Sequence, residues 1–328
     1  MSFDYIIKKY QYKPLLLFIF FLWLIINSNK NNIKHKKVIN SKISYQSNLT
    51  DTKITKSKVS DFDECYIPID NSNLKIIHFI ITRFLFEFHV DKEFRKNIYG
   101  EKYIRNGYRV IKKYLITSLE NQSCKDFSLL LTLGNKADIE YVKKIMNFKC
   151  SFYYRIIYIK DLKKIVEKLS NGYDVLITTR IDYDDIIYYD AVNDIRKSIN
   201  TEKPILLHGY NRGLYYFESN GKFYENYRRN GEKGALGLFL SLIVFLNKIN
   251  TTITIYDIGA HTHVRYNLIK MYKSLGIKEL NYEPSVFDSG AYKYIYIRQK
   301  YSVSYNNTRD IMKKKPILNI NFNKFYRK

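Results

Sequence analysis

Residues 173–185 read Tyr-Asp-Val-Leu-Ile-Thr-Thr-Arg-Ile-Asp-Tyr-Asp-Asp, an apolar run of strand length that ends directly in a cluster of aspartates. A short, nearly continuous apolar run is typical of a strand buried on both faces, as in a parallel sheet. In open sheets of that class, ligands bind outside the carboxyl ends of the strands. The stretch therefore predicts a buried strand with a polar site at its end.

The sequence around this stretch alternates further strand candidates with helical spacing, which predicts an α/β domain with a mostly parallel central sheet. Two of the later segments, 204–208 and 213–223, alternate as antiparallel strands do, around the turn Ser219-Asn-Gly. The expected strands are 75–82, 126–133, 152–159 and 173–179, with 253–256 as one more possibility, and the expected helices are 103–122, 137–146, 161–169 and 190–199.

The charge of this 328-residue chain, +24 in total, is concentrated at its two ends. Residues 1–60 hold 11 basic and 2 acidic residues, and residues 293–328 hold 10 and 1. The middle is close to balanced, so the charge gives little reason to expect a nucleic-acid partner; a basic end beside anionic lipid explains it as well. Three cysteines are too few for a disulfide framework, and none lies in a C-x-x-C pair.

The longest apolar run, residues 14–26 (Pro-Leu-Leu-Leu-Phe-Ile-Phe-Phe-Leu-Trp-Leu-Ile-Ile), predicts a signal anchor, with a cleaved signal peptide and a buried or interfacial helix as alternatives. Lysines flank it on both sides, so the positive-inside rule leans only slightly toward a cytosolic main domain. We therefore expect a single-pass membrane protein. The expected parts are an anchor over 1–28, a polar stalk over 29–72, the main domain over 73–290 and a basic extension over 291–328.

Asp182, Asp184 and Asp185 lie within four residues of one another. Carboxylates this close repel unless a cation lies among them, and Mg²⁺ or Mn²⁺ shared with nucleotide phosphates fits that need. The alternative is a solvated acidic turn that caps the following helix. The position after a buried strand favours the metal site.

Two segments resemble nucleotide-sugar glycosyltransferases of the GT-A fold, family 2. Residues 118–131 (Ser-Leu-Glu-Asn-Gln-Ser-Cys-Lys-Asp-Phe-Ser-Leu-Leu-Leu) are similar to the segment that links the first helix to the second strand in that family. Residues 176–185 are similar to its strand–D-x-D-D motif. Three features resemble the subgroup classed as rhamnosyltransferases. They are the form T-T-R-I-D-x-D-D, residues 81–84 (Ile-Thr-Arg-Phe) and residues 259–263 (Gly-Ala-His-Thr-His). The resemblance covers about residues 75–270.

The resemblance implies a role for each matching residue. Asp184 would bind the metal, and Asp182 the metal or the ribose. Asp185 would orient the sugar or the acceptor. Thr82 and Arg83 would line the nucleotide pocket, Arg180 would bind phosphate through its guanidinium fork, and His263, or else His261, would complete the metal shell. An inverting enzyme also needs a carboxylate base, and the candidates are Glu218, Glu225, Glu232 and Asp257. The expected catalytic residues are Asp185 and Asp257.

The sequence thus predicts a metal-dependent glycosyltransferase that moves a sugar, rhamnose by the subgroup resemblance, from a nucleotide-diphosphate donor to a glycan, a lipid-linked or another cell-surface acceptor. The main domain would be cytosolic in a bacterium and would face the Golgi lumen in a eukaryote. One departure from the family is residues 132–135 (Thr-Leu-Gly-Asn), where many members carry an acidic residue that contacts the base. The alternatives are a non-catalytic binder of anionic lipid or nucleic acid and a degenerate transferase-like scaffold.

Overall fold

A computed structural model of the chain describes residues 73–86, 97–227, 239–249, 251–259, 264–277, 285–287, 292–299, 309–317 and 320. The chain divides into two compact units after Lys58, and every described residue belongs to the second unit. The predicted anchor, the stalk up to residue 72, His261 and His263 lie outside the described residues. Within these ranges, no helix is both long and apolar enough to cross a bilayer.

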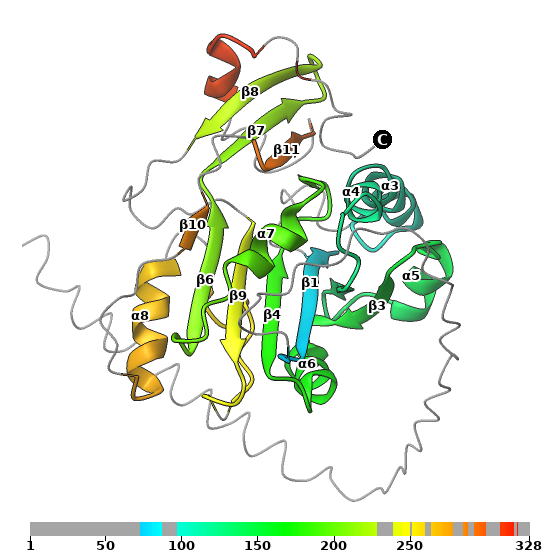
Figure 1. Ribbon diagram of the computed structural model, residues 1–328. Helices are drawn as coiled ribbons and strands as arrows, with labels where there is room; N and C mark the ends of the chain where they lie inside the picture. The colour runs from blue at the N-terminus through cyan, green and yellow to red at the C-terminus, as the bar shows by residue number, and fades with distance from the viewer. Residues whose placement is uncertain are drawn as a thin grey trace, which may run out of the picture. The chain divides into compact units, whose positions relative to one another are not determined.

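The centre of the fold is a seven-stranded mixed sheet (Figure 1). Its strands lie in the order β10 (Ser285–Phe287), β6 (Ile205–Tyr210), β9 (Leu240–Phe245), β4 (Val175–Arg180), β1 (Ile76–Phe84), β2 (Ser128–Leu133) and β3 (Tyr153–Tyr158). β4, β1, β2 and β3 run parallel to one another, whereas β9 is antiparallel to both of its neighbours. This mixed α/β sheet, rich in parallel pairs, confirms the predicted fold class at that level.

The strand order creates a topological switch point between β1 and β4. From β1 the chain steps outward to β2 and then to β3, and it returns to the other side of β1 as β4. In doubly wound sheets, ligands bind outside the carboxyl ends of the two strands that flank such a point. The carboxyl ends of β1 and β4 therefore mark where a site is expected.

Helices cover both faces of the sheet. Along β1, Phe79 and Ile81 pack in one apolar cluster with α6 (Leu162–Ser170) and α8 (Val264–Ser274). The alternate residues Ile80 and Phe84 pack in another cluster on the opposite face. A sheet buried on both faces explains why its strands are continuous apolar runs in the sequence. The opposite cluster includes residues of α3 (Glu101–Ile111), the π-helical turn η5 (Lys112–Ile116), α4 (Thr117–Glu120), α5 (Ile139–Ile145) and α7 (Ala191–Lys197).

A second, four-stranded sheet lies in the order β5 (Ile186–Ile187), β11 (Tyr294–Arg298), β7 (Arg212–Phe217) and β8 (Lys222–Tyr227). A single residue separates β6 from β7, so the chain passes directly from the central sheet into this one (Figure 1). Beside β11, Lys293 forms a buried ion pair of 2.8 Å with Asp194 in α7. The segment expected as a basic extension therefore contributes a strand to the folded body.

Two expectations of local structure are wrong. Residues 253–256 are not a strand, because the chain turns there and the Asp257 carboxylate accepts a hydrogen bond of 2.7 Å from the Thr254 amide. Residues 204–208 do not join the hairpin, because β6 pairs with β9 in the central sheet. The hairpin consists of β7 and β8, and Gly221 closes it with a φ of 65°, a conformation that suits glycine.

Two of the three cysteines, Cys124 and Cys150, lie among the described residues. Cys124 is fully buried and disulfide-bonded. Cys150 is a free thiol, and burial raises its pKa to about 12. The fold therefore depends on its apolar clusters rather than on a disulfide framework.

Candidate functional site

Two arginines meet beside one aromatic ring at the switch point. Arg83 is the penultimate residue of β1, and Arg180 is the last residue of β4. Their guanidinium carbons lie 5.4 and 5.6 Å from the centroid of the Tyr256 ring, within the range of cation–π attraction. Burial and the charge of Arg180 lower the pKa of Arg83, while Tyr256 and Asp182 oppose that shift. Two guanidinium groups this close favour a ligand with several negative charges, such as a diphosphate.

The loop that follows β4 forms a turn, in which the Asp185 amide donates a hydrogen bond of 3.2 Å to the Asp182 carbonyl oxygen. Asp182 and Asp184 are half-buried in this turn. Burial raises the pKa of Asp184, the charge of Asp182 raises it further, and the Arg298 guanidinium opposes the shift. The two carboxylates are therefore close enough to repel each other in a place of restricted hydration.

Tyr183 holds the turn against the core. Its ring meets Phe84 edge to face at a centroid distance of 5.3 Å, and its hydroxyl is hydrogen-bonded to Tyr103. Both partners lie on the side of the sheet that α3 covers. The tyrosine between the two aspartates thus fixes the turn.

Asp182 and Asp184 fit one class of divalent-cation site. Among the residues that the structure describes, no three His, Cys, Asp or Glu side chains gather to hold a metal ion. Mg²⁺ is commonly held by one or two protein carboxylates, with substrate phosphates and water completing its shell. The Asp182 and Asp184 carboxylates repel each other and lie near two arginines that can bind phosphate. This arrangement agrees with such a Mg²⁺ site.

Asp185 connects the same loop to the second sheet. Its side chain is 1% exposed, and its Oδ1 accepts a hydrogen bond of 3.1 Å from the Ile297 amide in β11. On the same strand, the guanidinium carbon of Arg298 lies 4.7 and 5.1 Å from the ring centroids of Tyr296 and Tyr215. This geometry favours a loop-holding role for Asp185; the catalytic role expected from the sequence stays a prediction.

The structure brings together Arg83, Arg180 and Asp182, with Asp184 beside Asp182, and it sets two predicted residues apart. Thr82 has the same strand parity as Ile80 and Phe84, so its side chain lies on the opposite face of β1 from Arg83. Its Oγ1 is buried and has no hydrogen-bond partner within the described chain. Asp257 is exposed, and its carboxylate closes the turn with Thr254. His263 lies outside the described residues.

Sequence reasoning missed Tyr256 and Arg298. Tyr256 lies in the segment expected as a strand, and Arg298 lies in the segment expected as an extension. Neither has a local pattern that separates it from the 32 tyrosines and 55 basic residues of the chain. Only the tertiary fold shows that Tyr256 interacts electrostatically with Asp182 and that Arg298 does so with Asp184. Both aspartates belong to residues 182–185, which we call the acidic loop.

No family model matches the chain, and no curated protein matches it. Among solved structures, it is similar to S. aureus TarS 1-349 in complex with UDP, at 12% identity and a TM-score of 0.37, over 67% of this chain. The match spans 60% of the TarS chain. It is also similar to the inositol-1-phosphate CTP transferase from T. maritima, at 11% identity and a TM-score of 0.33, over 69% of this chain and 91% of that one. At TM-scores this low, neither likeness decides what this chain does.

Proposed function

We propose that the chain is a divalent-cation-dependent glycosyltransferase that uses a nucleoside-diphosphate sugar. The observation that carries this proposal is the meeting of Arg83, Arg180 and the Asp182–Asp184 pair at the β1/β4 switch point. The site offers cationic groups for a diphosphate and hard oxygen ligands for a metal, in the place where doubly wound sheets bind nucleotides. The sequence resemblance supports a sugar as the group that is transferred, with rhamnose as the first candidate.

The chemistry of this site is displacement at an anomeric carbon. Arg83 and Arg180 hold the donor diphosphate and favour its negative charge as the bond to the sugar breaks. Asp182 and Asp184 would hold a Mg²⁺ or Mn²⁺ ion, which would supply further charge stabilisation to the leaving group. Tyr256 keeps the two guanidinium groups beside one another despite their repulsion. The acceptor is a glycan or another hydroxyl-bearing molecule of the cell surface.

The test is a donor screen with the full chain and Mn²⁺, in which transfer or hydrolysis of the sugar is followed by release of the nucleoside diphosphate. We expect at least one donor to turn over, with Asp184→Ala reducing turnover by about 100-fold or more. Asp310→Ala is the matched control, because this aspartate is exposed and, among the described residues, its ion pair is with its near neighbour Lys313. Equal turnover by Asp184→Ala and the wild type would contradict the proposal.

The same screen separates the other two hypotheses. A non-catalytic binder driven by the basic ends predicts no turnover, together with binding to anionic vesicles or nucleic acid that weakens steeply with salt. A transferase-like scaffold predicts neither turnover nor metal-dependent donor binding. Membrane attachment through residues 14–26 stays a prediction, and flotation of the full chain with liposomes tests it.

A further inference from the structure

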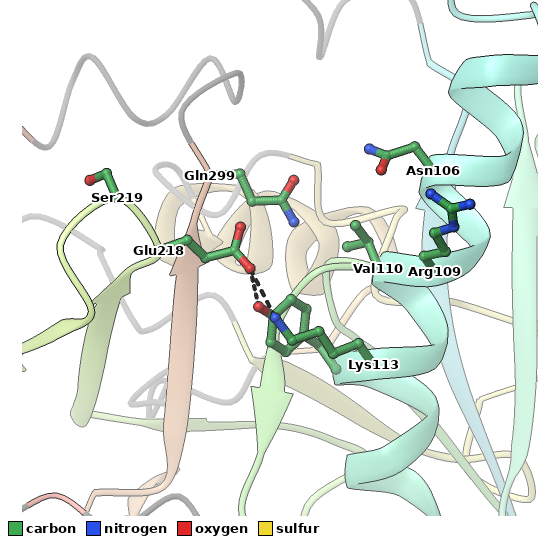
Figure 2. Close-up of a pocket in the computed structure, with 8 residues that line it drawn as sticks. Asn106, Arg109, Val110, Lys113, Glu218, Ser219 and Gln299 are labelled. Carbon is green, nitrogen blue, oxygen red and sulfur yellow. Dashed lines mark hydrogen bonds and ion pairs between the residues drawn. The ribbon is translucent and has the colours of Figure 1, made fainter.

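A cavity of about 410 Å³ lies between α3 and the end of the β7–β8 hairpin (Figure 2). One wall is a single face of the helical run, since Asn106, Arg109, Val110 and Lys113 follow at spacings of three, one and three residues. The facing wall contains Glu218 and, from the end of β11, Gln299 (Figure 2). Its volume falls in the range of small-molecule sites, and all but one of the residues that line it carry a polar group, although more of the exposed lining surface is apolar than polar.

The cavity neighbours the acidic loop but is distinct from the arginine pair. Glu218 is close enough to Asp184 for their charges to interact. Gln299 directly follows Arg298, the cation that interacts with the same carboxyl group. Arg83, Arg180 and Tyr256 do not line the cavity. A ligand in it would therefore approach the acidic loop from another direction than a diphosphate held by the arginines.

Within the described residues, one of the two carboxylate oxygens of Glu218 accepts hydrogen bonds. Its Oε1 accepts a hydrogen bond from the Tyr114 hydroxyl and another of 3.3 Å from Lys113 Nζ. Within the described residues, Oε2 has no hydrogen-bond partner. On the same wall, Gln299 Nε2 is buried and also has no hydrogen-bond partner within the described residues. Both residues line the same cavity (Figure 2).

The charges lining the cavity favour an anionic ligand. Arg109 and Lys113 supply two positive charges, and Glu218 supplies one negative charge. No hydrogen bond or ion pair engages the Arg109 guanidinium within the described chain, and a guanidinium fork binds phosphate or carboxylate oxygens in pairs. Amide and carboxylate groups such as those of Gln299 and Glu218 pair well with hydroxyl groups.

We infer that this cavity is the acceptor site, and that it takes a polyhydroxylated molecule carrying a phosphate or carboxylate group. Arg109 binds the anionic group, and Glu218 accepts the proton of the attacking hydroxyl. The acceptor oxygen forms its bond to the anomeric carbon, the bond from that carbon to the diphosphate oxygen breaks, and the electron pair leaves with the diphosphate. The proton moves to Glu218 Oε2, which becomes a carboxylic acid. This inference rests on the proposed function.

Binding of simple probes tests the cavity without knowledge of the acceptor. Glycerol 3-phosphate, glucuronic acid and neutral glucose are titrated into the full chain and followed by ligand-observed NMR. We expect one or both anions to bind more tightly than glucose, and Arg109→Gln to weaken that binding about tenfold or more. Which anion binds distinguishes phosphate from carboxylate. The control is Arg105→Gln, on the same helix but outside the cavity and paired with Glu101.

Binding of UDP, GDP and dTDP with Mn²⁺, measured in the same samples, separates failure of this inference from failure of the proposed function. If one of these nucleotides binds but Arg109→Gln and the wild type hold the anions equally, or glucose binds as well as they do, the acceptor site is overturned. If the anions respond to Arg109→Gln but no nucleoside diphosphate binds, the cavity is a real anion site and the glycosyltransferase proposal fails.

The role of Glu218 is tested by turnover. Glu218→Gln is expected to lower kcat about 100-fold or more while leaving donor affinity unchanged, because an amide cannot take the proton. Glu225→Gln, on the same hairpin but paired with Arg212, is the comparison. Retained kcat in Glu218→Gln, or an equal loss in Glu225→Gln, contradicts the assignment. Thermal melting of each variant shows whether the fold is intact.

Discussion

His78 is a buried histidine in the middle of β1, and it is held in its neutral form. Its Nε2 and the Thr179 hydroxyl are 2.7 Å apart, and that hydroxyl contacts Ser241 Oγ at 2.7 Å across β4 and β9. Burial, with a smaller effect from the positive charge of Arg196, lowers the pKa of His78 to about 3. A neutral imidazole therefore serves this chain as a hydrogen-bonding core residue, away from the arginine pair.

The lowered pKa of His78 predicts a pH-dependent stability. Between about pH 6.5 and pH 3 the unfolded chain binds a proton at this residue and the folded chain does not. The free energy of unfolding should fall as the pH drops through that window, by roughly 3 to 5 kcal/mol from this residue. His78→Gln keeps a side chain that can hydrogen-bond to Thr179 and removes the titratable group, so its urea-unfolding free energy should depend less on pH. His208, whose pKa is lowered to about 4, keeps part of the slope in both proteins.

At the site, single residues were predictable from the sequence to different degrees. Asp182, Asp184 and Arg180 were found because they follow a buried strand in one continuous stretch. Tyr256 was not, because its place beside two arginines depends on how a distant turn packs on the sheet. A local pattern identifies the residues that one strand carries, but not the ring that a separate segment brings to them.

At the scale of elements, α3 lies close to the end of β1 because of one glycine. A Cβ added at Gly107 would lie 2.2 Å from the Phe84 ring, which is 1% exposed and packed against Tyr103 and Tyr183. The ring has little room to move away. The glycine therefore sets the distance between the cavity-lining helix and the strand that carries Arg83.

Gly107→Ala is expected to destabilise the fold even though alanine is the better helix former. The helix-propensity gain is about 1 kcal/mol, whereas overpacking of a rigid core costs about 1 to 3 kcal/mol. Because the contact would lie more than 1 Å inside van der Waals distance, we expect the cost to prevail and the melting temperature to fall. Lys102→Ala, on the exposed side of α3, is the control. A melting temperature of Gly107→Ala at or above the wild-type value contradicts this account of the packing.

Most elements of the central sheet were predictable because strands buried on both faces are continuous apolar runs. Residues 75–82 and 173–179 were expected as strands, and β1 and β4 occupy nearly those bounds. The pairing of β6 with β9 was not predictable, because the alternating pattern of residues 204–208 does not indicate which strand they pair with. Nor was β11, whose five buried residues lie among lysines at the basic end of the chain.

At the scale of the whole molecule, the disulfide at Cys124 bears on the compartment of the protein. Disulfides persist in oxidising compartments and are rare in the cytosol. The placement of the main domain stays a prediction, and the persistence of this bond distinguishes a cytosolic from a lumenal placement.

Alkylation of the native-source protein tests this placement. If the bond is formed, iodoacetamide should label one cysteine, Cys150, in the denatured and unreduced chain, and all three after reduction. Mass spectrometry of the labelled chain counts the modified cysteines. Three labelled cysteines without a reductant would mean that the protein matures in a reducing compartment.

The central claim is that the β1/β4 switch point binds a nucleoside diphosphate through a metal on Asp182 and Asp184. Calorimetric titration of UDP, GDP and dTDP into the full chain with Mn²⁺ tests it most directly, using the wild type and Asp184→Asn. We predict that at least one nucleotide binds, that a chelator abolishes the binding, and that Asp184→Asn weakens it at least about tenfold. Failure of all three nucleotides to bind, or binding that neither the chelator nor Asp184→Asn changes, would contradict the account.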